Sequence, residues 1–266
     1  MAKGIPYGVS DFSRLVGQDY YYVDKTHFLP LIEDMANYLL WVRPRRFGKS
    51  VFLTMMRAYY DMSQKDRFEQ RFGNLWIGKH PTKLQGVYQV LYFDFSKANL
   101  GRGTLEDNFN DYCSVQLNDF FSTYAEYYQN ETDFDRIVAS TEASTKLHWL
   151  EATARRLGYL LYLIIDEYDN FTNVILSEQG KNLFRDLTHA SGFYREYFKQ
   201  FKGMFERIFM MGVSPVTLDD LSSGYNIDWN ISTAPQFNMM MGFSETEVRE
   251  MFRYYQQAGW KGISTK

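Results

Sequence analysis

Residues 38–53 read YLLWVRPRRFGKSVFL, a stretch that predicts a strand, a turn and a helix in succession. It opens with YLLWV, a continuous apolar run that is typical of a strand buried on both faces of a parallel sheet. A turn containing Gly48 follows, and the next residues predict a helix because their apolar members share one face. Those members are Val51, Phe52, Met55, Met56 and Tyr59. A buried strand, a tight turn and a helix N-terminus in this order can bind an anion such as phosphate.

The turn contains the tripeptide Gly48-Lys49-Ser50. Gly48 would let the backbone approach the phosphates, Lys49 would reach the β- and γ-phosphate oxygens, and the Ser50 hydroxyl would coordinate Mg²⁺. The general pattern G-x-x-x-x-G-K-[ST] has a glycine where this chain has Arg43. The predicted nucleotide-binding residues are Arg45, Arg46, Phe47, Gly48, Lys49, Ser50 and Val51. Taken alone, the cationic turn has a second interpretation, a solvated basic turn bound to carboxylates elsewhere.

A second chemical signal is YLLYLIIDEYDNF at residues 159–171, where an apolar run ends in Asp166 and Glu167. A hydrolytic phosphate-loop site needs one strand-end carboxylate for Mg²⁺ and often a second one that polarises the attacking water. Asp166 is therefore predicted to hold the metal together with Ser50, and Glu167 is predicted to be catalytic. The other interpretation is that these acids begin a surface loop. Asp169, three residues on, is better explained as a turn residue.

The stretch RIFMMGVSP predicts a further buried strand that ends in Ser214. A polar residue at the end of the strand beside the magnesium carboxylate can sense the γ-phosphate, which makes Ser214 a candidate sensor. A turn before Pro215 explains the same serine equally well.

Strands and helices alternate along the rest of the chain. Further strands are predicted at 88–96 and 237–243. Mostly helical regions are predicted at 104–157, between the 159–166 strand and about residue 203, and at 244–259. The last helix has Ser244 as its N-cap and Glu247 three residues later, which is the pattern of a capping box. Residues 5–19 look rich in turns, with a helix from about Lys25. This alternation predicts an α/β three-layer fold with a mainly parallel sheet.

Composition narrows the class of protein. The 266 residues have a net charge of −3, which argues against a protein that coats nucleic acid and leaves local nucleic-acid binding open. A single cysteine, Cys113, excludes an internal disulfide, and the four histidines lack metal-ligand spacing. There is no signal peptide, and the apolar stretches fall short of the ~20 residues of a membrane span. A cytoplasmic protein with no membrane segment is expected.

With RPRRFGKS, IIDEYDNF and GVSP identified, the chain resembles the AAA-ATPase-like family of bacteria and archaea. Arg43 in place of the first glycine is characteristic of that family. Its members typically join an ATPase region to a C-terminal domain of the PD-(D/E)XK nuclease type, which this chain does not include. The resemblance implies that Lys49 and Ser50 bind phosphate and Mg²⁺, that Asp166 is the magnesium carboxylate, and that Glu167 is the catalytic base.

The resemblance also implies a division of the chain. Residues 1–34 are expected to be an N-terminal extension packed on the core, residues 35–243 the P-loop ATPase domain, and residues 244–266 the truncated beginning of a helical lid. Arg195 is the candidate arginine finger, acting in its own chain or on a neighbouring subunit of a homo-oligomer, and Arg185 competes for that role. The segments VDKT and LDDL have no assigned role.

Two functions of different classes fit these residues. The first is an ATPase that uses ATP and Mg²⁺ as a motor or switch for a partner domain, for which a nuclease-like domain is expected. The second is a nucleotide-gated regulatory module with negligible hydrolysis of its own. A phosphoryl transferase is a weaker third, because no acceptor pocket is evident in the sequence.

Overall fold

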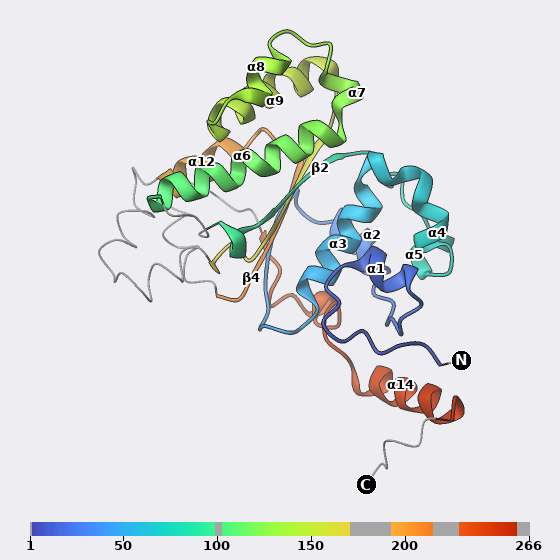
Figure 1. Cartoon of the computed structure of the whole chain (residues 1–266). Helices are drawn as coiled ribbons and strands as arrows, with labels where there is room; N and C mark the ends of the chain where they lie inside the picture. Colours follow the sequence, from blue (N-terminus) through green and yellow to red (C-terminus); the bar gives the residue numbers. More distant parts are fainter. Residues whose placement is uncertain (1, 99–102, 171–192, 215–228, 260–266) are drawn as a thin grey trace.

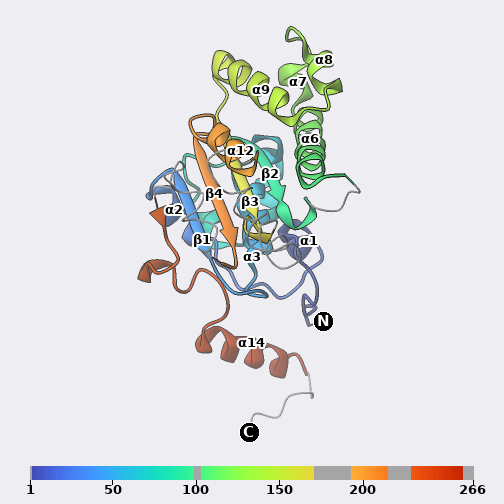
Figure 2. The ribbon, with the colours of Figure 1, turned by 90° about the vertical axis from the view of Figure 1, so that its left-hand side faces the viewer.

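The computed structural model describes residues 2–98, 103–170, 193–214 and 229–259. Its centre is a five-stranded sheet with the order β2-β3-β4-β1-β5, in which all neighbouring strands are parallel. The strands are β1 (Tyr38–Val42), β2 (Gln89–Asp94), β3 (Leu161–Asp166), β4 (Arg207–Gly212) and β5 (Trp229–Asn230). Figure 2 shows β4 between β1 and β3, so the two strands that end in the predicted site are separated by one strand.

Helices cover both faces of the sheet (Figure 1). On one side lie α1 (Phe12–Gly17), α2 (Phe28–Glu33), α3 (Lys49–Tyr60), α4 (Phe68–Phe72) and α5 (Trp76–Lys79). On the other lie α6 (Leu105–Thr123), α7 (Ala125–Tyr128), α8 (Phe134–Ala139), α9 (Ala143–Leu157) and α12 (Phe193–Phe201). The helix α14 (Glu245–Gln257) lies apart from the sheet, and short 3₁₀ turns occur at Met62–Arg67, Phe95–Lys97 and Pro235–Phe237.

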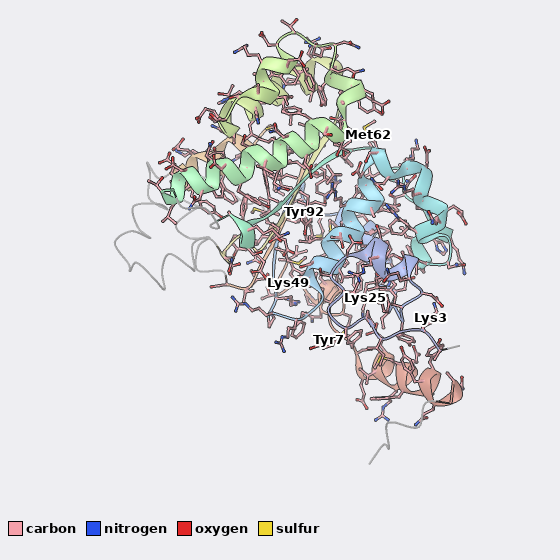
Figure 3. The ribbon with its side chains drawn as sticks, viewed as in Figure 1. Lys3, Tyr7, Lys25, Lys49, Met62 and Tyr92 are labelled. Carbon is pink, nitrogen blue, oxygen red and sulfur yellow. The ribbon has the colours of Figure 1, made fainter. Side chains whose placement is uncertain are left out.

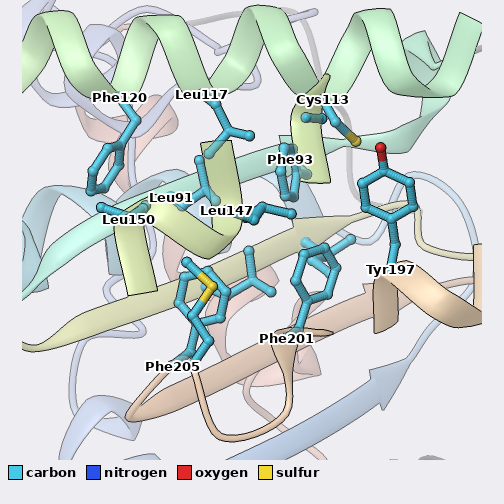
Figure 4. Close-up of a cluster of buried hydrophobic side chains, with 14 of the residues drawn as sticks. Leu91, Phe93, Cys113, Leu117, Phe120, Leu147, Leu150, Tyr197, Phe201 and Phe205 are labelled. Atoms are coloured by element: carbon cyan, nitrogen blue, oxygen red, sulfur yellow. The ribbon is translucent and has the colours of Figure 1, made fainter. Parts of the chain in front are cut away.

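The two cores follow from the alternation of side chains along each strand. Leu39 and Trp41 of β1 join a cluster with α1–α4, whereas Leu40 between them joins a cluster with α6, α9 and α12. Figure 4 shows the second cluster, in which side chains of α6 and α9 meet those of β2 and the segment around Phe205. The strands β1 to β4 are therefore buried on both faces, as their largely apolar sequences predict.

Several local predictions are confirmed. Strands occupy most of 38–42, 88–96, 159–166 and 207–214, and the region 104–157 is mostly helical. The capping box of α14 is present: the Ser244 side chain accepts from the Glu247 amide, and the Glu247 side chain accepts from the Ser244 amide.

Two local predictions are wrong. The run at 237–243 is not a strand: a 3₁₀ turn ends at Phe237, and the edge strand is β5, eight residues earlier in the chain. Phe237, Met240 and Met241 are buried against the α3 side of the core and do not pair in the sheet. The apolar run therefore indicated that these side chains are buried, but not that they form a strand. Within the turn-rich stretch 5–19, six residues form α1, which is capped by the Asp11 side chain.

Among the described helices, none combines the length and apolar character needed to cross a bilayer.

Candidate functional site

The loop between β1 and α3 lies at the edge of the sheet where the parallel strands end. The Arg43 amide donates to the carbonyl of Gly212, which ties the start of the loop to the end of β4. Gly48 is the N-cap of α3 with a φ of 86°, a left-handed conformation that glycine adopts without strain. An added Cβ at Gly48 would meet no atom within 4 Å, so the space directly beside this residue is open.

Lys49 turns back under this loop. Its side chain is only 5% exposed, and Nζ donates to the carbonyl oxygens of Arg43 at 3.2 Å and Pro44 at 3.1 Å. A phosphate oxygen is a stronger partner for an ammonium group than a neutral carbonyl. The lysine is therefore held where an anion bound to the loop would attract it (Figure 3).

Ser50 and Asp166 meet across 116 positions of sequence, with Ser50 Oγ donating to Asp166 Oδ2 at 2.6 Å. The Tyr92 hydroxyl approaches the same oxygen at 3.4 Å. Asp166 is 2% exposed, and its Oδ1 is buried without a hydrogen-bond partner among the described residues. Burial, together with the charge of Asp94, raises the pKa of Asp166 above its ordinary value, although Ser50 and Lys49 act against this.

An orphaned carboxylate oxygen beside a serine hydroxyl fits a hard divalent cation. Mg²⁺ prefers oxygen ligands and is usually held by one or two carboxylates together with phosphate oxygens. Asp166 and Ser50 supply a carboxylate and a hydroxyl at hydrogen-bond distance from each other, so their chemistry suits the metal. The described residues contain no cluster of three or more His, Cys, Asp or Glu, as would be needed for a cage built from protein side chains alone.

Glu167 follows β3 directly and is half-buried. Its φ is 52°, so a non-glycine residue is held in left-handed backbone at this point. Burial and the neighbouring Asp166 raise the pKa of Glu167, whereas Lys49 and Arg45 lower it.

The sequence reasoning overlooked Asp94. It ends β2 and is the direct register partner of Asp166. Its carboxylate accepts from the Ser96 amide and hydroxyl and pairs with Lys97 at 3.0 Å. The signal was available in YFDFS, since Asp94 is an acid near the end of the strand predicted at 88–96.

Asp169 anchors the end of β4. The residue is 1% exposed and accepts hydrogen bonds from the amides of Val213 and Ser214, the latter at 2.7 Å. The Tyr168 hydroxyl donates to the carbonyl of Ser214 at 2.5 Å. Asp169 and Tyr168, which follow β3, thus position the backbone of Ser214, the candidate sensor.

The other predicted residues vary in what the structure describes. Phe47 is 42% exposed, and its carbonyl accepts from the Gly242 amide at 3.2 Å. Val51 packs at the margin of the α3 core. Arg195 lies in the first turn of α12, but its side chain is outside the described part of the chain. Arg185 and the segment LDDL at 218–221 also lie outside the described residues.

The segment VDKT at 23–26 is a structural clasp. Asp24 and Thr26 accept the first two amides of α5, at 2.6 and 3.1 Å. Lys25, buried between them, donates to the carbonyl of Met239 at 2.9 Å and to Glu247 at 2.5 Å. The clasp therefore joins the α5 region to the start of α14, on the same side of the molecule as Lys49 (Figure 3).

A parallel α/β sheet, a glycine-containing turn at a helix N-terminus and a buried strand-end carboxylate beside it are compatible with a P-loop-like fold. The chain belongs to the AAA-ATPase-like family: the model of that family, described as "Predicted AAA-ATPase", matches residues 6–222. Membership suggests that the protein binds ATP.

The chain is also similar to an uncharacterized protein in the vnfD 5′ region of Azotobacter chroococcum mcd 1. The two are 27% identical over 267 residues, which cover 94% of this chain and 45% of that protein. The chain thus spans less than half the length of this relative. No solved structure matches the chain.

Proposed function

We propose that the chain is a P-loop ATPase domain of three-layer architecture that binds Mg·ATP and hydrolyses it as a motor or switch. The observation that supports this most strongly is the contact between Ser50 and Asp166 at 2.6 Å, with Lys49 buried beneath the adjoining loop. If the loop were only a solvated basic turn, there would be no reason for the Ser50 hydroxyl and the Asp166 carboxylate to lie this close together, because they belong to two different elements.

In this proposal each side chain has one task. The loop amides and Lys49 bind the β- and γ-phosphates, and Ser50 and Asp166 hold Mg²⁺. When bound, the metal neutralises charge on the phosphate oxygens. Glu167 orients the attacking water and accepts its proton, a task favoured by the raised pKa that burial gives this carboxyl.

Ser214 and Arg195 have supporting roles. Ser214 stands at the end of β4, the strand between the two that carry the loop and the carboxylate, and is proposed to sense the γ-phosphate. Arg195 is proposed as an arginine finger that acts in its own chain or on a second copy in a homo-oligomer.

The proposed organisation keeps residues 1–34 as an N-terminal extension, 35–243 as the ATPase domain and 244–266 as the beginning of a helical lid. The partner is a nuclease-type domain outside this chain, and the compartment is the cytoplasm, which suits the single buried thiol of Cys113. The alternative remains a nucleotide-gated module that binds ATP with negligible turnover. The open space beside Gly48 suits both functions, whereas Glu167 favours hydrolysis.

The test is phosphate release from Mg·ATP by the purified chain and by Lys49→Ala and Glu167→Gln. Lys79→Ala and Glu106→Gln are matched controls, since they remove the same groups from exposed positions on α5 and α6. Turnover that both site variants abolish and both controls retain supports the ATPase. ATP binding that requires Lys49, without turnover, supports the gated module. A chain that does not bind ATP contradicts both.

A further inference from the structure

Tyr92 reaches the candidate site from the strand next to that of Asp166. It lies on β2, two residues before Asp94, and Asp94 is the register partner of Asp166. Side chains two residues apart on a strand point to the same face, as do those of register partners in a parallel sheet. Tyr92 and Asp166 therefore share the face that α3 covers. From there the Tyr92 hydroxyl lies 3.4 Å from Asp166 Oδ2.

The Tyr92 ring is held in place from two sides. It packs against the cluster of buried side chains on the α3 side of the sheet. The Arg57 guanidinium of α3 lies 5.8 Å from the centre of the ring, within the range of a cation–π contact. Figure 3 shows Tyr92 between Lys49, at the start of α3, and Met62, just after its end. Because the phenol oxygen lies on the axis about which the ring turns, a packed ring also fixes the position of that oxygen.

The Asp166 carboxylate receives both of its described side-chain hydrogen bonds on one oxygen. Ser50 Oγ donates to Oδ2 at 2.6 Å, and the Tyr92 hydroxyl donates to the same oxygen at 3.4 Å. Oδ1 is buried without a partner among the described residues. A carboxylate turns easily about its last bond, so the aspartate side chain by itself does not decide which oxygen faces which neighbour. Two donors from two different elements keep Oδ2 turned toward them and leave Oδ1 without a competing donor.

Ser50 and Tyr92 differ in their relation to the proposed metal. Ser50 is a proposed ligand, so its hydroxyl oxygen is engaged by the metal when the metal binds. Tyr92 is not a proposed ligand, and its phenol is a neutral donor at neutral pH. Tyr92 can therefore orient the carboxylate both with and without the metal.

We propose that Tyr92 is a positioning residue for magnesium, whose hydroxyl holds the Asp166 carboxylate in the orientation that binds the ion. The assignment rests on the proposed function and extends the site to β2. Partners that hydrogen-bond a metal-ligating carboxylate typically contribute about 10–100-fold to metal affinity. The contact at 3.4 Å is long for a hydrogen bond between oxygens, so the effect belongs at the lower end of that range.

The test measures by calorimetry how Mg²⁺ strengthens the binding of a non-hydrolysable ATP analogue. Tyr92→Phe removes the hydroxyl and keeps the packed ring. Tyr38→Phe is the matched control: its half-buried hydroxyl donates to the carbonyl of Phe205 at 3.2 Å, and it begins β1 at the end away from the phosphate loop. In Tyr92→Phe the Mg²⁺ concentration that gives half of the gain in affinity should rise about tenfold. The affinity in chelator should not change, and Tyr38→Phe should match the parent in both measurements.

The comparison with and without Mg²⁺ separates a positioning role from a structural one. An equal loss of affinity in Mg²⁺ and in chelator would show that the hydroxyl only supports the fold, and would overturn the proposal. An unchanged Mg²⁺ dependence in Tyr92→Phe, or an equal shift in Tyr38→Phe, would overturn it as well. In these cases, binding by the parent that Mg²⁺ strengthens and that requires Lys49 leaves the proposed function standing. A parent chain that does not bind the analogue overturns both.

Discussion

Asp166→Asn should stabilise the nucleotide-free protein while removing its response to magnesium. The parent buries a carboxylate that is 2% exposed and has one oxygen without a hydrogen-bond partner among the described residues. An unsatisfied buried acceptor costs about 1–3 kcal/mol, and more when it is charged. The amide has nearly the same size and can still accept from Ser50, so the substitution removes most of the penalty for burying charge.

The cost of burying the charged Asp166 carboxylate sets the size of the expected gain in stability. A gain of about 1–2 kcal/mol corresponds to a rise in Tm of about 2–8 °C for a chain of this size. In the parent, ligand at 100 times its Kd adds about 2.7 kcal/mol to stability. Without the Asp166 carboxylate the magnesium-dependent part of this gain should disappear. The variant should therefore melt above the parent in buffer and below it in saturating Mg·ATP.

The assay is thermal unfolding of both proteins in buffer, in ATP with a chelator, and in Mg·ATP. The dependence on pH supplies an internal check, because burial raises the pKa of Asp166 and so penalises its ionised form in the folded chain. The advantage of the variant should be largest at neutral pH and should shrink as the pH falls toward 3.8, the ordinary pKa of aspartic acid. A variant that melts below the parent at neutral pH, or that keeps the full response to magnesium, would refute the reasoning.

Three further outcomes are expected. Lys25→Met should speed amide hydrogen exchange in α14 several-fold or more, because it removes the hydrogen bond to Glu247. Exchange in the core strands should change much less. Unchanged exchange in α14 would contradict the role of VDKT as a clasp. Burial raises the pKa of Glu247, but the hydrogen bonds from Lys25 and the Ser244 amide outweigh it, so the pKa lies below its ordinary value. The bond between Lys25 and Glu247 should therefore stabilise α14 at neutral pH and be lost as the pH falls through that lowered pKa. Amide hydrogen exchange of α14 measured against pH would show this loss. Gly212→Ala should lower the free energy of unfolding by about 1–3 kcal/mol, since its Cβ would lie 2.4 Å from the Tyr168 ring and 2.5 Å from Asp169. Chemical denaturation measures this change. An unchanged free energy of unfolding would show that β4 shifts to make room for the methyl group.

The predictions that the structure confirms concern features a few residues long. The strand, turn and helix of 38–60 and the capping box of α14 depend on hydrophobic periodicity and on contacts within one helical turn, which are written directly in the order of residues. The strand predicted at 237–243 was wrong for a related reason. Periodicity reports that Phe237 and Met240 are buried, but not whether their backbone pairs with a sheet or packs beside one.

The candidate site was predicted in part: some of its residues were evident in the sequence and others were not. The order of residues alone indicated Lys49, Ser50, Asp166 and Glu167 as candidates, because a glycine-containing turn follows one predicted buried strand and two acids follow another. It did not identify Asp94, whose relevance depends on β2 being the neighbour of β3. Nor did it show that the Arg43 guanidinium donates to the carbonyl of Ser232, which lies in the segment after β5.

The order of residues was therefore enough to predict the α/β class, the turn at Gly48 and the acids at a strand end. It did not reveal that β4 lies between β1 and β3, that Ser50 touches Asp166 across 116 positions, or that Lys25 reaches Glu247 across 222. The physical reason is that apolar strands of similar composition can pair in several orders. The order that is realised depends on packing summed over both faces of the whole sheet, and no local pattern of residues records that sum.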